Sequence, residues 1–157
     1  MALTPKQLEY QRRWRRENPE QYKAQQKRTR ISRNAKINSD FDCFVDYSYT
    51  SLRSGAQARG YAFKITKSQL KKILLEIRNC GLTGRELTHQ QHDPYKASID
   101  RIDNNQGYVK GNLQVVGARI NRHRLDLPLA DFLQMCFDVA KHHGWQPPVD
   151  QQDESVV

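Results

Sequence analysis

Apolar residues in the middle of this chain recur at intervals of three or four, which predicts helices that bury one face. The first such pattern covers 41–56, and Gly60 is a suitable stop after it. A second pattern covers 70–77 and follows Thr66, whose spacing to Gln69 is that of a capping box. Both segments are therefore predicted to be helices that carry part of the core.

The spacing changes at 98–103, where apolar and polar side chains alternate as they do in a strand. This pattern predicts a strand with Ile99 and Ile102 near its buried edges and Asp100 between them. The residues after it are rich in asparagine and glycine, which favour a turn. A polar turn, a second apolar run and a helical segment are predicted at 104–107, 113–116 and 118–124.

The N-terminal segment has few apolar residues but clear helix signals. Thr4 and Pro5 make a good N-cap and first-turn pair. Pro19 repeats this signal, so one helix is predicted to stop near Glu17 and a second to start at Pro19. Helices with so few apolar residues are either solvated or laid against a charged partner.

Near the C-terminus, Pro128 marks another helix start, and apolar positions over 132–140 predict a helix that closes the core before Gly144. Residues 146–157 include two prolines and three acidic side chains and show no periodicity, so this tail is predicted to be disordered.

A chain of 157 residues suits one domain with appendages. The patterns divide it into a helical arm over 1–39, a domain over 40–145 and the tail over 146–157. The central unit of the domain is expected at about 80–125.

The charge of the chain is strongly basic and uneven. Lys and Arg outnumber Asp and Glu by 26 to 17, which gives a net charge of +9 and a pI near 9.6 and points to a polyanion partner. Residues 1–36 hold 11 Lys and Arg against three Glu, a net of +8, which leaves +1 for the rest. The arm is thus either a solvated basic tail or a segment that follows DNA phosphates. Its candidates for DNA contact are Arg12, Arg13, Arg15, Arg16, Lys27, Arg28, Arg30 and Arg33.

Three motifs in sequence order, SIDRID at 98–103, GYVKGN at 107–112 and Ile120-Asn121 followed by basic residues, resemble the HNH endonuclease family, especially its phage-type members. The resemblance covers about 80–132. It implies an α+β protein with a ββα-metal catalytic unit, here packed with several helices and joined to a basic helical arm. By position, it implies Asp100 as the metal ligand on the strand, Asn112 as the residue that braces the loop and Asn121 as the metal ligand on the helix. Arg122 and Arg124 follow as further candidates for DNA contact.

The family's histidine after the strand ligand is replaced here by Arg101. Because a guanidinium stays protonated, Arg101 cannot act as the general base. We expect it to grip the scissile phosphate, and the alternative is that it pairs with Asp100 or Asp103. Other candidates for the base are His89, His92 and His123, beside hydroxide from solution, and the first two lie in a polar stretch that also suits an exposed loop.

Carboxylate and amide oxygens such as those of Asp100 and Asn121 suit Mg²⁺ or Mn²⁺. Family relatives often carry paired cysteines that bind structural zinc. Cys43, Cys80 and Cys136 are too few and too scattered for such a site, so we expect no structural zinc and free thiols.

The resemblance implies a metal-dependent endonuclease that hydrolyses phosphodiester bonds in double-stranded DNA, of the phage homing or free-standing type. One alternative is a catalytically degenerate HNH scaffold that only binds DNA, and another is a small structural or RNA-binding basic protein. The sequence has no signal peptide and no apolar run long enough to span a bilayer. We therefore expect a cytoplasmic protein, in the host cell if it is phage-encoded, with no membrane association and no obligate protein partner.

Overall fold

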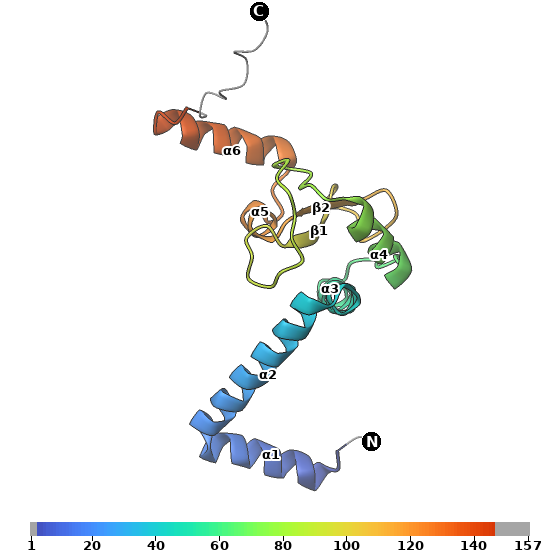
Figure 1. Cartoon of the computed structure of the whole chain (residues 1–157), viewed down its shortest axis with the longest axis vertical. Helices are drawn as coiled ribbons and strands as arrows, with labels where there is room; N and C mark the ends of the chain where they lie inside the picture. Colours follow the sequence, from blue (N-terminus) through green and yellow to red (C-terminus); the bar gives the residue numbers. More distant parts are fainter. Residues whose placement is uncertain (1–2, 147–157) are drawn as a thin grey trace, which may run out of the picture.

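Six helices and a two-stranded sheet make up residues 3–146, the part of the chain that the computed structural model describes. The elements are α1 (Pro5–Glu17), α2 (Pro19–Ser39), α3 (Phe41–Ala58), α4 (Lys67–Glu76), β1 (Ala97–Arg101), β2 (Leu113–Gly117), α5 (Ala118–Arg124) and α6 (Leu129–His142). The sheet and α5 lie in the middle of the molecule, between α3 and α4 on one side and α6 on the other (Figure 1). The α+β class predicted from the sequence is confirmed.

The arm consists of α1 and α2, which extend away from the sheet (Figure 1). Thr4 Oγ1 accepts the N–H of Gln7 at 3.4 Å, and Gln7 Oε1 accepts the N–H of Thr4 at 2.8 Å, so the predicted capping box starts α1. As predicted, α1 ends at Glu17 and a separate helix, α2, begins at Pro19 and runs in a different direction (Figure 1).

The last turn of α2 belongs to the core. Ile37 of α2 is buried in one apolar cluster with Phe44 of α3 and Leu74 of α4. Asp40 separates α2 from α3 and caps α3, because its Oδ1 accepts two backbone N–H groups of the first turn at 2.8 and 3.2 Å. The arm is therefore anchored to the domain by packing as well as by the chain.

The two strands and α5 follow one another in the predicted ββα order. β1 and β2 are antiparallel, with Asp100 opposite Gln114. The prediction that Ile102 lies near a buried edge is wrong, since 56% of its surface is exposed. The reason is that β1 ends at Arg101, and the backbone then turns into the loop before β2.

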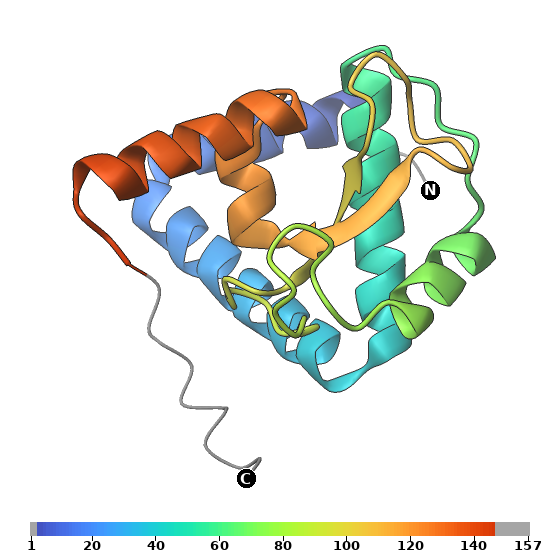
Figure 2. The same ribbon diagram turned by 90° about the horizontal axis from the view of Figure 1, so that it is seen from above.

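The prediction that the last helix closes the core is also wrong. Phe132 is the one buried residue of α6, whereas Leu133 and Phe137 are exposed. Leu125 has a φ of 54°, which turns the chain sharply after α5, and α6 then runs along the outside of the molecule (Figure 1, Figure 2). The predicted disorder of the tail falls on residues outside the described range, apart from Gln146.

Within residues 3–146, the structure has no helix of sufficient length and hydrophobicity to cross a membrane.

Candidate active site

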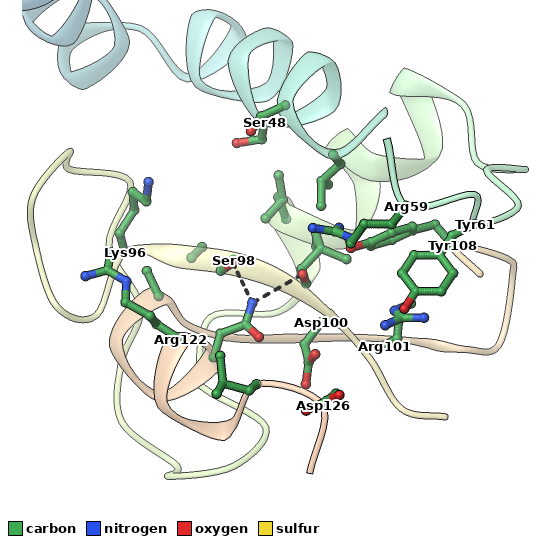
Figure 3. A pocket seen from close by; sticks show the side chains of 18 of the residues that line it. Ser48, Arg59, Tyr61, Lys96, Ser98, Asp100, Arg101, Tyr108, Arg122 and Asp126 are labelled. Carbon is green, nitrogen blue, oxygen red and sulfur yellow. Dashed lines mark hydrogen bonds between the residues drawn. The ribbon is translucent and has the colours of Figure 1, made fainter. Parts of the chain in front are cut away.

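A cavity of about 660 Å³ lies where α3 faces β1 and α5. Figure 3 shows Lys96 and Arg122 on one side of it and Arg59 and Arg101 on the other, with Asp100 between them in this view. The cavity thus collects charged side chains from α5, from β1 and from the segments between the helices and strands.

Asp100 is the next-to-last residue of β1 and lines this cavity, although only 7% of it is exposed. Its Oδ2 accepts hydrogen bonds from Gln114 Nε2 at 3.0 Å and from Arg124 Nη1 at 3.1 Å. No side chain within residues 3–146 donates a hydrogen bond to its Oδ1. Burial raises the pKa of Asp100, and Arg124 and Gln114 offset part of that rise. One oxygen of a carboxylate held in place is therefore available to a ligand.

Asn121 lines the same cavity from the middle of α5. Its Nδ2 donates to Ser98 Oγ at 2.9 Å and to Ile99 O at 3.5 Å, the two bonds drawn in Figure 3. Both partners are on β1, so the amide nitrogen is tied to the strand that carries Asp100. The amide oxygen has no hydrogen-bond partner in the part of the chain that the structure describes.

Asn112 is buried behind the loop that joins the two strands. Its Oδ1 accepts the N–H of Asp103 at 2.8 Å, and its Nδ2 donates to the carbonyls of Asp103 and Gly107, both at 3.0 Å. One side chain thus ties the last residue of the loop to its beginning and to its middle.

Arg101 lines the cavity, and its guanidinium lies against the base of the loop. Nη1 donates to the carbonyls of Asn104 at 2.8 Å and Gln106 at 2.9 Å, and the guanidinium carbon is 3.8 Å from the centroid of the Tyr61 ring. No ion pair within residues 3–146 joins Arg101 to Asp100 or to any other carboxylate. The described residues therefore do not contain the alternative ion pair between Arg101 and a neighbouring aspartate.

Arg122 and Arg124 have different surroundings. Arg122 lines the cavity and is exposed. Arg124 is only 1% exposed, and its Nη1 binds Asp100 Oδ2. The prediction that Arg124 contacts DNA is therefore wrong, because its charge is turned inward to meet a buried carboxylate.

None of the three imidazoles proposed as a base lines the cavity. His89 is half-buried and packs against the rings of Phe41 and Phe44, with centroid distances of 4.7 and 4.8 Å, and burial lowers its pKa. The His92 ring is hydrogen-bonded to Asn34 of α2. His123 is exposed on α5.

The basic residues of the arm that were predicted to contact DNA lie on α1 and α2, at the surface of the molecule. Arg15 lies over the ring of Tyr22 at 5.1 Å, which links the two helices. Arg33 lies over the ring of Tyr47 at 5.6 Å, and Tyr47 lines the cavity. Arg33 is thus the arm residue that the structure brings next to the site.

Two cations and one carboxylate of the cavity were not predicted from the sequence. Arg59 Nη2 donates to the Tyr108 hydroxyl at 3.3 Å, and Lys96 and Asp126 line the cavity wall. A signal for Lys96 exists, because residues four apart in an extended segment point to the same side, and Lys96 is four before Asp100. Arg59 has no such signal, since it enters the site through the packing of α3.

The oxygens of Asp100 and Asn121 fit a hard divalent ion. Mg²⁺ is usually held by one or two protein oxygens, several waters and substrate phosphates. Residues 3–146 contain no group of three His, Cys, Asp or Glu side chains that could hold a metal ion, so such an ion would depend on the Asn121 amide. The three cysteines are free thiols in the structure.

Comparisons with known proteins give two distant likenesses. No protein-family model matches the chain. An uncharacterized 29.0 kDa protein from the dda-modA intergenic region of Enterobacteria phage T4 is 29% identical over 82 residues, which are 52% of this chain and 32% of the phage protein. The chain therefore spans about a third of that relative. The rare-cutting HNH restriction endonuclease PacI superposes with a TM-score of 0.46 and 19% identity, over 64% of this chain and 80% of the PacI chain. Both likenesses lie below the level at which a family assignment follows.

Proposed function

We propose that this protein is a DNA endonuclease of the HNH type that hydrolyses phosphodiester bonds in double-stranded DNA. The observation that carries the proposal is the pairing of Asp100 and Asn121 in one cavity. In each side chain, hydrogen bonds from or to other side chains occupy one terminal atom, and no side chain in the described residues donates to the remaining oxygen. Two oxygens held in this way suit a metal-assisted site.

The charge of the cavity supports a phosphate substrate. Arg59, Lys96, Arg101 and Arg122 line it, and Asp126 is the exposed carboxylate among its described lining residues. The charge of Asp100 is balanced by the buried Arg124. A cavity with this excess of cations attracts an anionic chain, and the exposed basic residues of the arm extend the attraction.

Arg101 is proposed to hold the scissile phosphate. Since Nη1 is committed to two loop carbonyls, Nε and Nη2 remain as the edge that can donate two parallel hydrogen bonds to a phosphate. The Tyr61 ring at 3.8 Å keeps the guanidinium plane in one orientation. An Arg fixed in this way can stabilise the negative charge that develops on the phosphate during attack.

Asp100 and Asn121 would hold a divalent ion such as Mg²⁺ or Mn²⁺, which when bound neutralises charge on the phosphate and on the leaving oxygen. The chain's own contribution is to fix these two ligands. Gln114 and Arg124 hold Asp100 by Oδ2, and Ser98 holds Asn121 by Nδ2. Because Oδ2 of Asp100 and Nδ2 of Asn121 are already held by hydrogen bonds, the two side chains need little rearrangement to bind an ion through their other atoms.

The attacking oxygen is proposed to come from hydroxide in solution, because no imidazole of residues 3–146 lines the cavity. In this step the new bond forms between the hydroxide oxygen and phosphorus. The bond from phosphorus to the 3′ oxygen breaks, and the 3′ oxygen takes a proton from solvent. Cleavage should then speed up continuously as the pH rises, without a plateau near neutral pH.

A second candidate is a DNA-binding protein on an HNH scaffold that has lost catalysis. The observation that favours it is Arg101 in the position where the family carries its base, together with the absence of an imidazole from the cavity lining. This protein would bind DNA with the same arm and cavity but leave it uncut.

Nicking of supercoiled plasmid in Mg²⁺ or Mn²⁺ tests the proposal. Asp100→Asn is the informative variant, because an amide oxygen can still accept from Arg124 while the ligand charge is lost. Asp138→Ala, an exposed change on α6 far along the chain from the site, is the matched control. We expect metal-dependent nicking by the parent and the control, and none by Asp100→Asn with an unchanged circular dichroism spectrum. A parent that binds the plasmid without nicking it in either metal selects the second candidate.

A further inference from the structure

A group of cations lies on the side of the cavity nearest the arm. Arg33 of α2 and Lys96, which directly precedes β1, both lie over the ring of Tyr47, at 5.6 and 5.9 Å from its centroid. Arg122 of α5 lines the cavity on the same side as Lys96 (Figure 3). Three elements that are distant in sequence therefore bring three positive charges to one place.

Hydrogen bonds hold α2 against the loop that carries Lys96. Asn38 Oδ1 accepts the N–H of Gln91 at 2.7 Å, and Asn34 Nδ2 is 2.8 Å from His92 Nε2. Both asparagines lie on α2, within five residues of Arg33. These hydrogen bonds therefore fix the position of Arg33 relative to Lys96 in the folded protein.

The group has no carboxylate to neutralise it. No ion pair within residues 3–146 includes Arg33, Lys96 or Arg122. Lys96 Nζ has a neutral acceptor, Gln91 Oε1, at 3.3 Å. Burial, and then the charge of Arg122, lowers the pKa of Lys96. These charges repel one another in the free protein, and a bound anion would relieve that repulsion.

We propose that Arg33, Lys96 and Arg122 form a second phosphate-binding subsite, which holds a backbone phosphate of DNA on the side of the cavity opposite Arg59 and Arg101. The inference rests on the proposed function. With one phosphate at Arg101 and another at this subsite, the strand crosses Asp100 and Asn121 and continues toward the exposed basic residues of α2. The subsite therefore joins the cleavage site to the arm along one path.

Binding of double-stranded DNA in EDTA over a series of salt concentrations tests the subsite without any cleavage. Lys96→Gln removes one charge of the group, Lys96→Arg keeps it, and Lys72→Gln removes an exposed charge of α4 outside the cavity. We expect Lys96→Gln to reduce the slope of log affinity against log salt by about 0.9, the value for one phosphate contact. Lys96→Arg and Lys72→Gln should keep the parent's slope.

Thermal unfolding at low salt separates this effect from misfolding. Because Lys96→Gln removes a half-buried charge that lacks a carboxylate partner in the described residues, it should melt at or above the temperature of the parent. A lower melting temperature together with an unchanged salt slope would assign Lys96 to folding alone and overturn the subsite.

The remaining outcomes distinguish the subsite from the proposed function. If the parent binds and nicks DNA but Lys96→Gln keeps the parent's slope, the subsite is overturned and the proposed function stands. If the parent binds no DNA, both are overturned. Melting in inorganic phosphate is a further measurement. If phosphate raises the melting temperature of the parent but not of Lys96→Gln, and the two proteins have the same salt slope for DNA, the group binds a free phosphate. The assignment to DNA is then wrong.

Discussion

Arg124 donates from Nη1 to Asp100 Oδ2 at 3.1 Å, and both side chains are withdrawn from solvent. The pair joins the end of α5 to the end of β1, next to Arg101. Arg124 holds Asp100 by Oδ2, and the proposed metal ion would bind Oδ1. Arg124, which the sequence suggested as a DNA contact, is thus a positioning residue for the proposed metal ligand.

The first prediction concerns the removal of this arginine. Arg124→Met leaves the Asp100 carboxylate buried without its main opposing charge, so the pKa of Asp100 should rise further. Breaking one side of a buried pair typically costs about 3–5 kcal/mol of unfolding free energy. Urea unfolding at pH 7 measures the loss. The exposed Arg122→Met is the matched control and should change stability by less than about 0.5 kcal/mol.

A double variant checks that the cost comes from the unpaired charge. Arg124→Met with Asp100→Leu replaces both partners by apolar side chains, and buried pairs replaced in this way often regain their stability. We expect the double variant to be more stable than Arg124→Met alone and unable to nick DNA. A double variant as unstable as the single one would show that Arg124 supports the fold through packing and not through Asp100.

The second prediction separates the ligand on α5 from the residue that holds it. Asn121→Ala removes the amide oxygen and should slow nicking by at least about a hundredfold, or roughly 2.7 kcal/mol. Ser98→Ala removes the acceptor of Asn121 Nδ2 and should cost about tenfold, in the range found for residues that orient ligands. DNA binding in EDTA should be unchanged in both. Normal nicking by Asn121→Ala would show that α5 carries no ligand.

The third prediction concerns Arg101. Arg101→Lys keeps the charge but loses the planar edge and the stacking on Tyr61. If Arg101 grips the scissile phosphate, nicking should fall by at least about tenfold, or roughly 1.4 kcal/mol. A Lys variant as fast as the parent would remove Arg101 from the mechanism. If the parent is inactive and Arg101→His nicks DNA, the protein is a scaffold that has lost its base.

The fourth prediction follows from the half-buried imidazole. Burial, and then the charge of Arg78, lowers the pKa of His89 below its ordinary value of 6.5. Between that value and the lower folded pKa, the unfolded chain binds a proton that the folded chain does not, so stability should decrease as the pH falls below about 6.5. His89→Phe keeps a ring against Phe41 and Phe44 and should lose this part of the pH dependence.

Urea unfolding over a series of pH values on both sides of 6.5 measures the effect. The exposed His123→Phe is the control and should follow the parent. A parent and His89→Phe with parallel pH profiles would show that His89 is solvated in the folded state.

Local signals account for what the sequence predicted well. The capping boxes at Thr4 and Thr66, the break before Pro19 and the ββα order depend on neighbours within a few residues, and the structure contains each of them. Asp100 and Asn121 line one cavity because β1 pairs with β2 and α5 follows β2 directly, which brings α5 next to β1.

What the sequence did not predict depends on contacts between distant segments. An Arg in a basic run such as that at the end of α5 looks like a DNA contact, and only the position of β1 shows that Arg124 is turned inward. Arg59 reaches the cavity because α3 packs beside the sheet. The apolar positions of α6 have the spacing of a core helix, yet the turn at Leu125 takes the helix outward.

The last prediction concerns how much of the arm can be removed. Residues 1–31 contain nine of the eleven basic residues of the arm segment, because Arg33 and Lys36 follow them. A chain that starts at Ser32 keeps Ile37, Asn38 and the cap at Asp40, so it should remain folded. A chain that starts at Phe41 lacks all three residues, and the removal of the Ile37 side chain alone should cost about 2–5 kcal/mol.

DNA binding by the chain from Ser32 then separates the contribution of the arm's charge to binding from the contribution of its end to folding. The chain from Ser32 should bind DNA more weakly, with a salt slope that falls by about 0.9 for each phosphate that the removed residues bind in the full protein. Its melting temperature should stay close to that of the parent. Because this chain retains Arg33, Lys96→Gln should still reduce its slope by the amount seen in the full chain. If the chain from Ser32 has the salt slope of the full protein, α1 and the first half of α2 do not follow the DNA. Binding would then depend on the cavity and the cations beside it.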